Sequence, residues 1–175
     1  DAFRAFIAQR RPGDRIEAVP MLRGRIVRIG ERRSEEVKAD SNAAWVLEGD
    51  RGITYSARPP EGSQVVEGEW WPADYAGPPL VSMDADIARG LGLKIGDSIA
   101  VNVAGRIIAA RLSNLRRVDW RSFGINFVLV FSPSTFAGAP PATRSKWVTS
   151  SSAQPFCCGT KSMSSSPIAI TFFIS

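Results

Sequence analysis

The most regular pattern along the chain is an alternation of apolar and polar residues on both sides of Ala104 and Gly105. Every second residue is apolar in 98–103 and again in 106–112, which is the period of a half-buried β-strand. Ala104 and Gly105 separate the two runs and reverse the chain direction. The pattern predicts a β-hairpin whose inward-facing side chains are Ile99, Val101, Val103, Ile108, Ala110 and Leu112.

Shorter β-prone runs predict further strands, most of them followed by residues typical of turns. Residues 126–131 form a mostly continuous apolar run, as in a strand that is buried on both faces. Pro59 and Pro60 end the run before them, because proline has no backbone N–H to donate. The other strand candidates are residues 16–19, 26–29, 44–47, 53–57, 65–66 and 80–82.

Two segments have a helical period. Residues 1–9 gather their apolar side chains on one face, and Pro12 follows them. Over 83–90, apolar residues recur at every fourth position, and Ser82 or Asp84 can accept hydrogen bonds from the free N–H groups at the helix start. Glycines at 90 and 92 are expected to end this helix, whose apolar face would consist of Met83, Ile87 and Leu91. Strands and helices together predict an α+β fold.

The charge and composition of the chain limit the classes of function that it can have. The chain has 175 residues, enough for one hydrophobic core, and a formal net charge of +5. All 17 acidic residues lie in 1–119 together with 18 basic ones, so the excess charge comes from an acid-free C-terminal third. We therefore expect a solvated surface without the clustered basic face that binding to nucleic acid requires.

The sequence also lacks the usual components of a catalytic or metal site. It has no histidine, the commonest general base and metal ligand. Cys157 and Cys158 are adjacent, so they cannot supply the spaced ligands of a zinc site. No run reaches the roughly 18–20 apolar residues that cross a bilayer. The chain starts at Asp1 without a signal-peptide pattern, and we expect it to be a piece of something longer.

Three motif-like stretches are interpreted as turns or solvated loops. The glycines at 90, 92 and 96 are spaced one residue too long for a dinucleotide fingerprint, and they follow a helix where that motif needs a strand. "GDSI" at 96–99 is similar to the start of the GDSL hydrolases, but Ser98 would need a histidine as its base. Glu67, Glu69 and Asp74 are carboxylates beside aromatic residues, as in a sugar site, and are interpreted as solvated.

Trp70, Trp71 and Tyr75 form the candidate partner-interaction site. They lie in a loop over 68–79 that is rich in glycine and proline. Two adjacent indoles cannot easily enter one core together, so one is expected to be buried and the other to stand at the surface. Aromatic side chains are enriched at contact patches, but they also pack loops, and both interpretations stay open.

The stretch from Val65 to Pro140 resembles the extracytoplasmic core domain of MacB/FtsX-like ABC transporter permeases. "PMLRGRIV" and "WVLEGDRGITYSA", at 20–27 and 45–57, match the bacterial subgroup named for a link to lysophospholipase L1 biosynthesis. The resemblance covers about residues 1–140. Its other motifs are "GEWW" at 68–71, "LVS" at 80–82, "ARGLGLKIGD" at 88–97, the hairpin at 99–112 and "FVLVFSP" at 127–133.

This resemblance implies a non-enzymatic domain between the first two membrane helices of a permease, on the periplasmic side of the bacterial inner membrane. It implies an incomplete porter-like α/β part in 1–66 and a small β-rich subdomain in 67–140, without catalytic, cofactor or metal residues. Its work would be to bind cargo or a partner and to transmit ATPase-driven motion. The implied partners are a cytoplasmic ATPase subunit, a second permease copy, and a periplasmic adaptor or lipid-like cargo, with no nucleic acid.

Residues 141–175 depart from that pattern. They are rich in serine, contain no acid and have no sustained period, so we expect an irregular tail of the kind that a frameshifted or disordered segment gives.

Two alternatives from other classes remain open on the sequence. "LGLKIGDSIAV" also resembles the helix–turn–strand element of small β-barrels in DNA-binding transition-state regulators, which dimerise and present a basic face. A GDSL-like serine hydrolase with Ser98 as the nucleophile is the other alternative.

Overall fold

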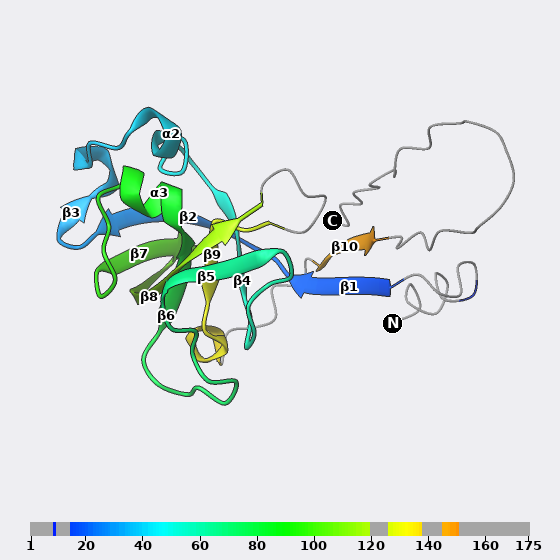
Figure 1. Cartoon of the computed structure of the whole chain (residues 1–175). Coiled ribbons are helices and arrows are strands. Elements are labelled where there is room, and N and C mark those ends of the chain that lie inside the picture. The colour runs from blue at the N-terminus through cyan, green and yellow to red at the C-terminus, as the bar shows by residue number, and fades with distance from the viewer. Residues whose placement is uncertain (1–8, 10–14, 120–125, 138–144, 151–175) are drawn as a thin grey trace, which may run out of the picture.

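The computed structural model describes residue 9 and residues 15–119, 126–137 and 145–150 (Figure 1). Strands dominate these residues, and the helical segments are short. The strands are β1 Arg15–Pro20, β2 Leu22–Ile29, β3 Arg32–Arg33, β4 Arg51–Tyr55, β5 Ser63–Gly68, β6 Leu80–Asp84, β7 Ser98–Val103, β8 Arg106–Val118, β9 Leu129–Phe131 and β10 Ser145–Ser150. The helical segments are η1 Ser34–Glu36, α2 Ser41–Ala44, α3 Ala85–Gly90 and η2 Pro133–Phe136.

Six of these strands close into a mixed barrel in the order β2, β4, β9, β6, β8, β7. The ring closes because β7 pairs antiparallel with β8 on one side and with β2 on the other. The β4–β9 and β6–β8 pairs are parallel, and the other pairs in the ring are antiparallel. β3 lies beside β2, β5 lies beside β8, and β1 pairs with β10 in a separate sheet. The α+β expectation is met in outline by a mostly β fold with short helices.

The hairpin predicted around Ala104 and Gly105 is confirmed. These two residues have φ angles of 50° and 86°, the left-handed conformation that both central residues of a type I′ turn adopt. The inward-facing residues of the hairpin are buried, apart from the half-buried Ile108. β8 continues to Val118, beyond the predicted end at 112, because it pairs there with β5 and β6.

The core fills the barrel and continues under α2 and α3, which pack against each other (Figure 1). A Cβ at Gly24 would lie 2.8 Å from Cγ1 of Val101, so the barrel interior leaves no room for a side chain at this position. Between the helices, a Cβ at Gly90 would lie 2.7 Å from that of Ala43. Fully buried core residues include Ile26, Ile53, Val81, Met83, Leu91, Ile99, Val101, Leu112, Leu129 and Phe131.

The strand predicted over 44–47 is wrong. These residues continue from α2 as a turn, in which the N–H of Val46 donates to the carbonyl of Ala43 at 3.0 Å. Ala43 and Val46 are both buried, and a separation of three residues is the spacing of a helical turn and not of a strand. The other strand candidates are confirmed within a few residues at their ends.

Met83 was expected on the apolar face of the helix, and this prediction is also wrong. Met83 lies in β6, where it is paired with Leu115 of β8 and Leu129 of β9. The helix α3 begins only at Ala85, since Asp84 is its N-cap. Ile87 remains on the buried face of the helix, as predicted.

The expected division at 66/67 stays a prediction. In the described residues both ranges supply strands to the barrel, and position 66 lies inside β5. Of the expected helix over 1–9, residues 1–8 lie outside the described residues. Of the tail, residues 145–150 are described and form β10, a strand that the sequence did not predict. No helix in the described part of the chain is long and apolar enough to cross a membrane.

Candidate functional site

The loop between β5 and β6 is fastened to the barrel by its two tryptophans. The Trp71 Nε1–H donates to the carbonyl of Ser56 at 2.9 Å, and the Trp70 Nε1–H donates to the carbonyl of Ala57 at 3.1 Å. The two indole rings lie 4.2 Å apart at an angle of 34°. Adjacent indoles therefore bind adjacent carbonyls in the segment that leaves β4.

Trp71 is the buried member of the pair, with 4% of its surface exposed. It packs with Phe127 and Val130 in a cluster separate from the main core, against which Trp70 and Tyr75 are half-buried. The Tyr75 hydroxyl donates to the carbonyl of Pro78 at 2.9 Å, within the same loop. The three aromatic residues of the candidate partner-interaction site are thus brought together, but only Trp70 and Tyr75 keep appreciable exposed surface.

A row of buried polar side chains lies on β6 and β8, where no candidate site residue was predicted. Ser82 is paired with Asn114 and Asp84 with Arg116 on these parallel strands, and all four residues are buried. For Asp84, the sequence predicts only a helix cap. A run of polar residues within a strand is the signal that could have indicated the row.

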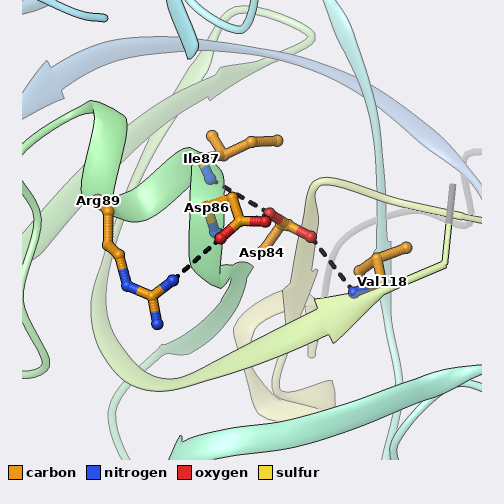
Figure 2. A network of polar contacts seen from close by, with 5 residues as sticks. All are labelled: Asp84, Asp86, Ile87, Arg89 and Val118. Carbon is orange, nitrogen blue, oxygen red and sulfur yellow. Dashed lines mark hydrogen bonds and ion pairs between the residues drawn. The ribbon is translucent and has the colours of Figure 1, made fainter. Parts of the chain in front are cut away.

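Asp84 binds three backbone N–H groups (Figure 2). Its Oδ1 accepts from the N–H groups of Asp86 and Ile87 at 3.0 and 3.2 Å, and its Oδ2 accepts from that of Val118 at 3.3 Å. The first two bonds cap α3, and the third ties the helix start to the end of β8. Arg89 forms an ion pair with Asp86 at the surface, at 2.9 Å.

Arg116 is fully buried and directed at carbonyl groups. Its Nη2 donates to the carbonyls of Phe127 and Val128, the second at 3.1 Å, just before β9. Burial lowers the pKa of the Arg116 guanidinium to about 10, and the charge of Asp84 opposes this shift, so the group is still cationic at neutral pH. Asp84, Arg116 and the Nδ2 of Asn114 bind backbone groups of other segments, so we assign the row a structural role. The Ser82 Oγ, the Asn114 Oδ1 and the Arg116 Nε are buried without a hydrogen-bond partner among the described residues.

The glycine-rich and "GDSI" stretches form turns, as predicted. Gly92 and Gly96 have φ angles of 68° and 98°, and Asp97 accepts from the N–H of Lys94 at 2.8 Å. Ser98 is exposed where β7 begins, opposite Arg111 of β8. Within the described residues, no group of three or more His, Cys, Asp or Glu side chains could hold a metal ion. The carboxylates of Glu67, Glu69 and Asp74 are exposed.

The outer surface of β2, β3, β7 and β8 gathers arginines, which corrects the expectation that basic residues would not cluster. None of these four strands contains Asp or Glu. A β-bulge between Ile26 and Arg28 shifts the alternation by one residue, so that both Arg25 and Arg28 face outward. We use the name arginine face for the part of this surface that carries the exposed Arg23, Arg25, Arg28, Arg33 and Arg111. Arg32, Arg106 and Arg117 are further exposed arginines of these strands.

The chain is similar to a segment of a bacterial transporter. It is 28% identical over 132 residues to the "Uncharacterized ABC transporter permease YbbP" of Escherichia coli (strain K12), and the match covers 75% of this chain. The chain spans only 15% of the length of that permease. No family model and no solved structure matches the chain. The chain is therefore distantly related to an ABC transporter permease.

Proposed function

We propose that the chain is a non-catalytic, extracytoplasmic domain of an ABC transporter permease of the MacB/FtsX-like kind. The observation that carries the proposal is the 132-residue similarity to a permease of which this stretch makes up a small part. The matched segment is short and has a barrel fold of its own. Both properties are expected of a domain that is inserted between two membrane helices. In this proposal it lies on the periplasmic side of the inner membrane.

The polar chemistry of the fold agrees with a mechanical role. The buried Asp84 and Arg116 are engaged by backbone groups of α3, β8 and the segment before β9, so they hold elements together. A closed ring of strands has a low compressibility and transmits displacement between its two sides. The domain would thus pass on motion that a cytoplasmic ATPase subunit generates, within an assembly of two permease copies.

Cargo or partner contact is the second part of the proposal. Trp70 and Tyr75 present half-buried aromatic surface on a loop that Trp71 anchors. Rigid aromatic side chains with little conformational freedom left to lose are favourable contact residues. We assign this surface to a periplasmic adaptor or a lipid-like cargo. The porter-like identity of 1–66, and the subgroup named for lysophospholipase L1 biosynthesis, belong to the same proposal.

The placement can be tested in cells that produce the protein. An antibody raised against the purified chain should detect it in the membrane fraction. Added protease should remove the signal from spheroplasts and leave it in intact cells, while a cytoplasmic marker survives in both. A signal in the soluble cytoplasm, or one that protease cannot reach in spheroplasts, would refute the proposal.

A DNA-binding barrel of the transition-state-regulator kind is the second candidate, because the structure has both a six-stranded barrel and an arginine face. Those regulators dimerise, whereas the strands of this barrel all come from one chain and close without a partner. The similarity to a permease favours the first proposal. A salt-dependent affinity for duplex DNA, measured without lipid vesicles, would favour the DNA-binding barrel.

A further inference from the structure

We propose that the arginine face binds the surface of an anionic lipid bilayer, with the tip of the β7–β8 hairpin inserted among the headgroups. The inference rests on the proposed function, which places the domain beside a membrane. It identifies which surface of the domain faces the bilayer and which class of lipid this surface binds.

Within the part of the chain that the structure describes, carboxylates do not neutralise the charge on this face. In the described residues, the five arginines of the arginine face form no ion pair. Five acidic residues lie near the ends of these strands: Glu31 in the β2–β3 turn, Glu35 and Glu36 after β3, Asp97 before β7 and Asp119 after β8. The Asp97 carboxylate accepts from the N–H of Lys94. Glu36 accepts a hydrogen bond from the backbone N–H of Arg33. Arg25, Arg28 and Arg111 therefore point to solvent from strands without a carboxylate.

An exposed aliphatic side chain lies among these arginines. The register places Arg25 beside Asn102 of β7, and Asn102 beside Ile107 of β8, so the three residues form one row across the barrel wall. Ile107 is 67% exposed, which makes it the most exposed large apolar residue in the described part of the chain. The next row runs from Arg28 through residue 100 to residue 109, both alanines.

An apolar side chain at a strand turn, with cations around it, is the arrangement that binds a bilayer interface. The aliphatic group enters the boundary between headgroups and acyl chains, while the guanidinium groups bind lipid phosphates. Single-stranded nucleic acid would need aromatic side chains on which bases stack, and β2, β3, β7 and β8 contain none. Phosphate recognition together with an exposed Ile107 therefore favours lipid over nucleic acid.

The test is co-sedimentation of the full purified chain with vesicles. We expect binding to vesicles that contain phosphatidylglycerol and little binding to phosphatidylcholine alone, with weaker binding as ionic strength rises. The triple variant Arg25→Gln, Arg28→Gln, Arg111→Gln should bind about 100-fold more weakly, at about 5-fold for each arginine. Ile107→Ser should weaken binding several-fold and leave its salt dependence unchanged.

A matched control removes the same charge elsewhere. Lys38, Arg58 and Arg89 are exposed but lie outside β2, β3, β7 and β8, and their triple replacement by Gln should keep binding within about 3-fold. Equal losses in both triple variants would overturn the proposal, as would equal binding to neutral vesicles, or no binding at all. A duplex or single-stranded oligonucleotide that displaces the chain from vesicles at equal phosphate concentration would assign the face to nucleic acid and also overturn it. These outcomes leave the protease test of the permease placement unaffected, so the two proposals can fail separately.

Discussion

Asp84 and Arg116 lie opposite each other on the parallel strands β6 and β8, but each side chain binds backbone groups on a different side. The carboxylate accepts from N–H groups of α3 and β8, and the guanidinium donates to carbonyls that precede β9. With 3% and 1% of their surfaces exposed, the two residues join four segments of chain around one point. The charge of Asp84 also lowers the cost of burying the Arg116 guanidinium, because it opposes the pKa shift that burial causes.

The Asp84 cap is expected to be worth about 2 to 4 kcal/mol of unfolding free energy, because its removal leaves α3 without a cap and the Val118 N–H without an acceptor. Urea unfolding of Asp84→Ala, followed by circular dichroism, measures this loss. The neighbouring Asp86 is exposed, and Asp86→Ala should cost less than about 0.5 kcal/mol. Equal stability of the two variants would show that the cap does not hold the start of the helix.

Arg116→Met is expected to destabilise the fold by about 2 to 4 kcal/mol, since the carbonyls of Phe127 and Val128 lose their donor and Asp84 loses its counter-charge. Arg117→Met is the matched control, because Arg117 is the exposed neighbour on the same strand. Thermal or urea unfolding compares the two. A small effect at both positions would contradict the structural role of the buried guanidinium.

The pH dependence of the Arg116 contribution has a defined sign. Burial lowers the folded-state pKa to about 10, below its ordinary value, so the buried charge costs stability at neutral pH, and that cost is relieved only as pH rises above about 10. The stability difference between the wild type and Arg116→Met should therefore be flat below about pH 9. Unfolding measured across this range checks it, and a slope near neutrality would show that another group titrates with Arg116.

Replacing Trp71 is expected to destabilise the fold more than replacing Trp70. Trp71→Ala is expected to cost about 3 to 5 kcal/mol, because it empties a packed site beside Phe127 and frees the carbonyl of Ser56. Trp70→Ala should cost less than half of that, as its ring is only half-buried. Urea unfolding of the two variants ranks them, and the reverse order would mean that Trp70 is the anchor of the loop.

The proposed function predicts that Trp70→Ala, made in the whole protein, reduces cargo-dependent ATP hydrolysis or transport at a temperature where the domain is still folded. The reason is that Trp70 and Tyr75 supply the exposed aromatic surface of the loop. Val66→Ala, at an exposed position of β5, controls for loss of surface area elsewhere. Unchanged activity in Trp70→Ala would retire this loop as a contact site.

Ala104 is the non-glycine residue with positive φ among the described residues, and its replacement by Asn or Gly should stabilise the hairpin by about 0.5 to 1 kcal/mol. Ala104→Val should destabilise it, because a β-branched side chain is strained in this conformation. Ala109→Gly, at an exposed position within β8, is expected to be destabilising and so provides a control of opposite sign. Identical effects of glycine at the two positions would contradict the type I′ turn.

The sequence predicted the structural elements that depend only on residues close together along the chain. The β7–β8 hairpin is local, so the alternation on either side of Ala104 and Gly105 was sufficient to place it. Asp84 was recognised as a candidate cap from its position just before an apolar helical spacing. The strand predicted at 44–47 failed because a short apolar run has no period that separates a strand from a helical turn.

The pairing of strands that are far apart along the chain could not be predicted from the sequence. β2 closes the barrel on β7, and β9 enters between β4 and β6, across separations that no local pattern encodes. Arg116 and Arg117 are chemically identical neighbours, yet one is buried and the other exposed, which depends on what covers the strand. The outward direction of Arg28 depends on a bulge, and a strict alternation would have placed it inside.

The position of β9 has a consequence for synthesis on the ribosome. It is the last strand of the ring along the chain, yet it belongs between β4 and β6. Until Phe131 has been released, those two earlier strands each expose an edge that can pair with a foreign polypeptide. The nascent domain therefore passes through an open-sided stage, and a chaperone that protects it has to act before the last strand enters.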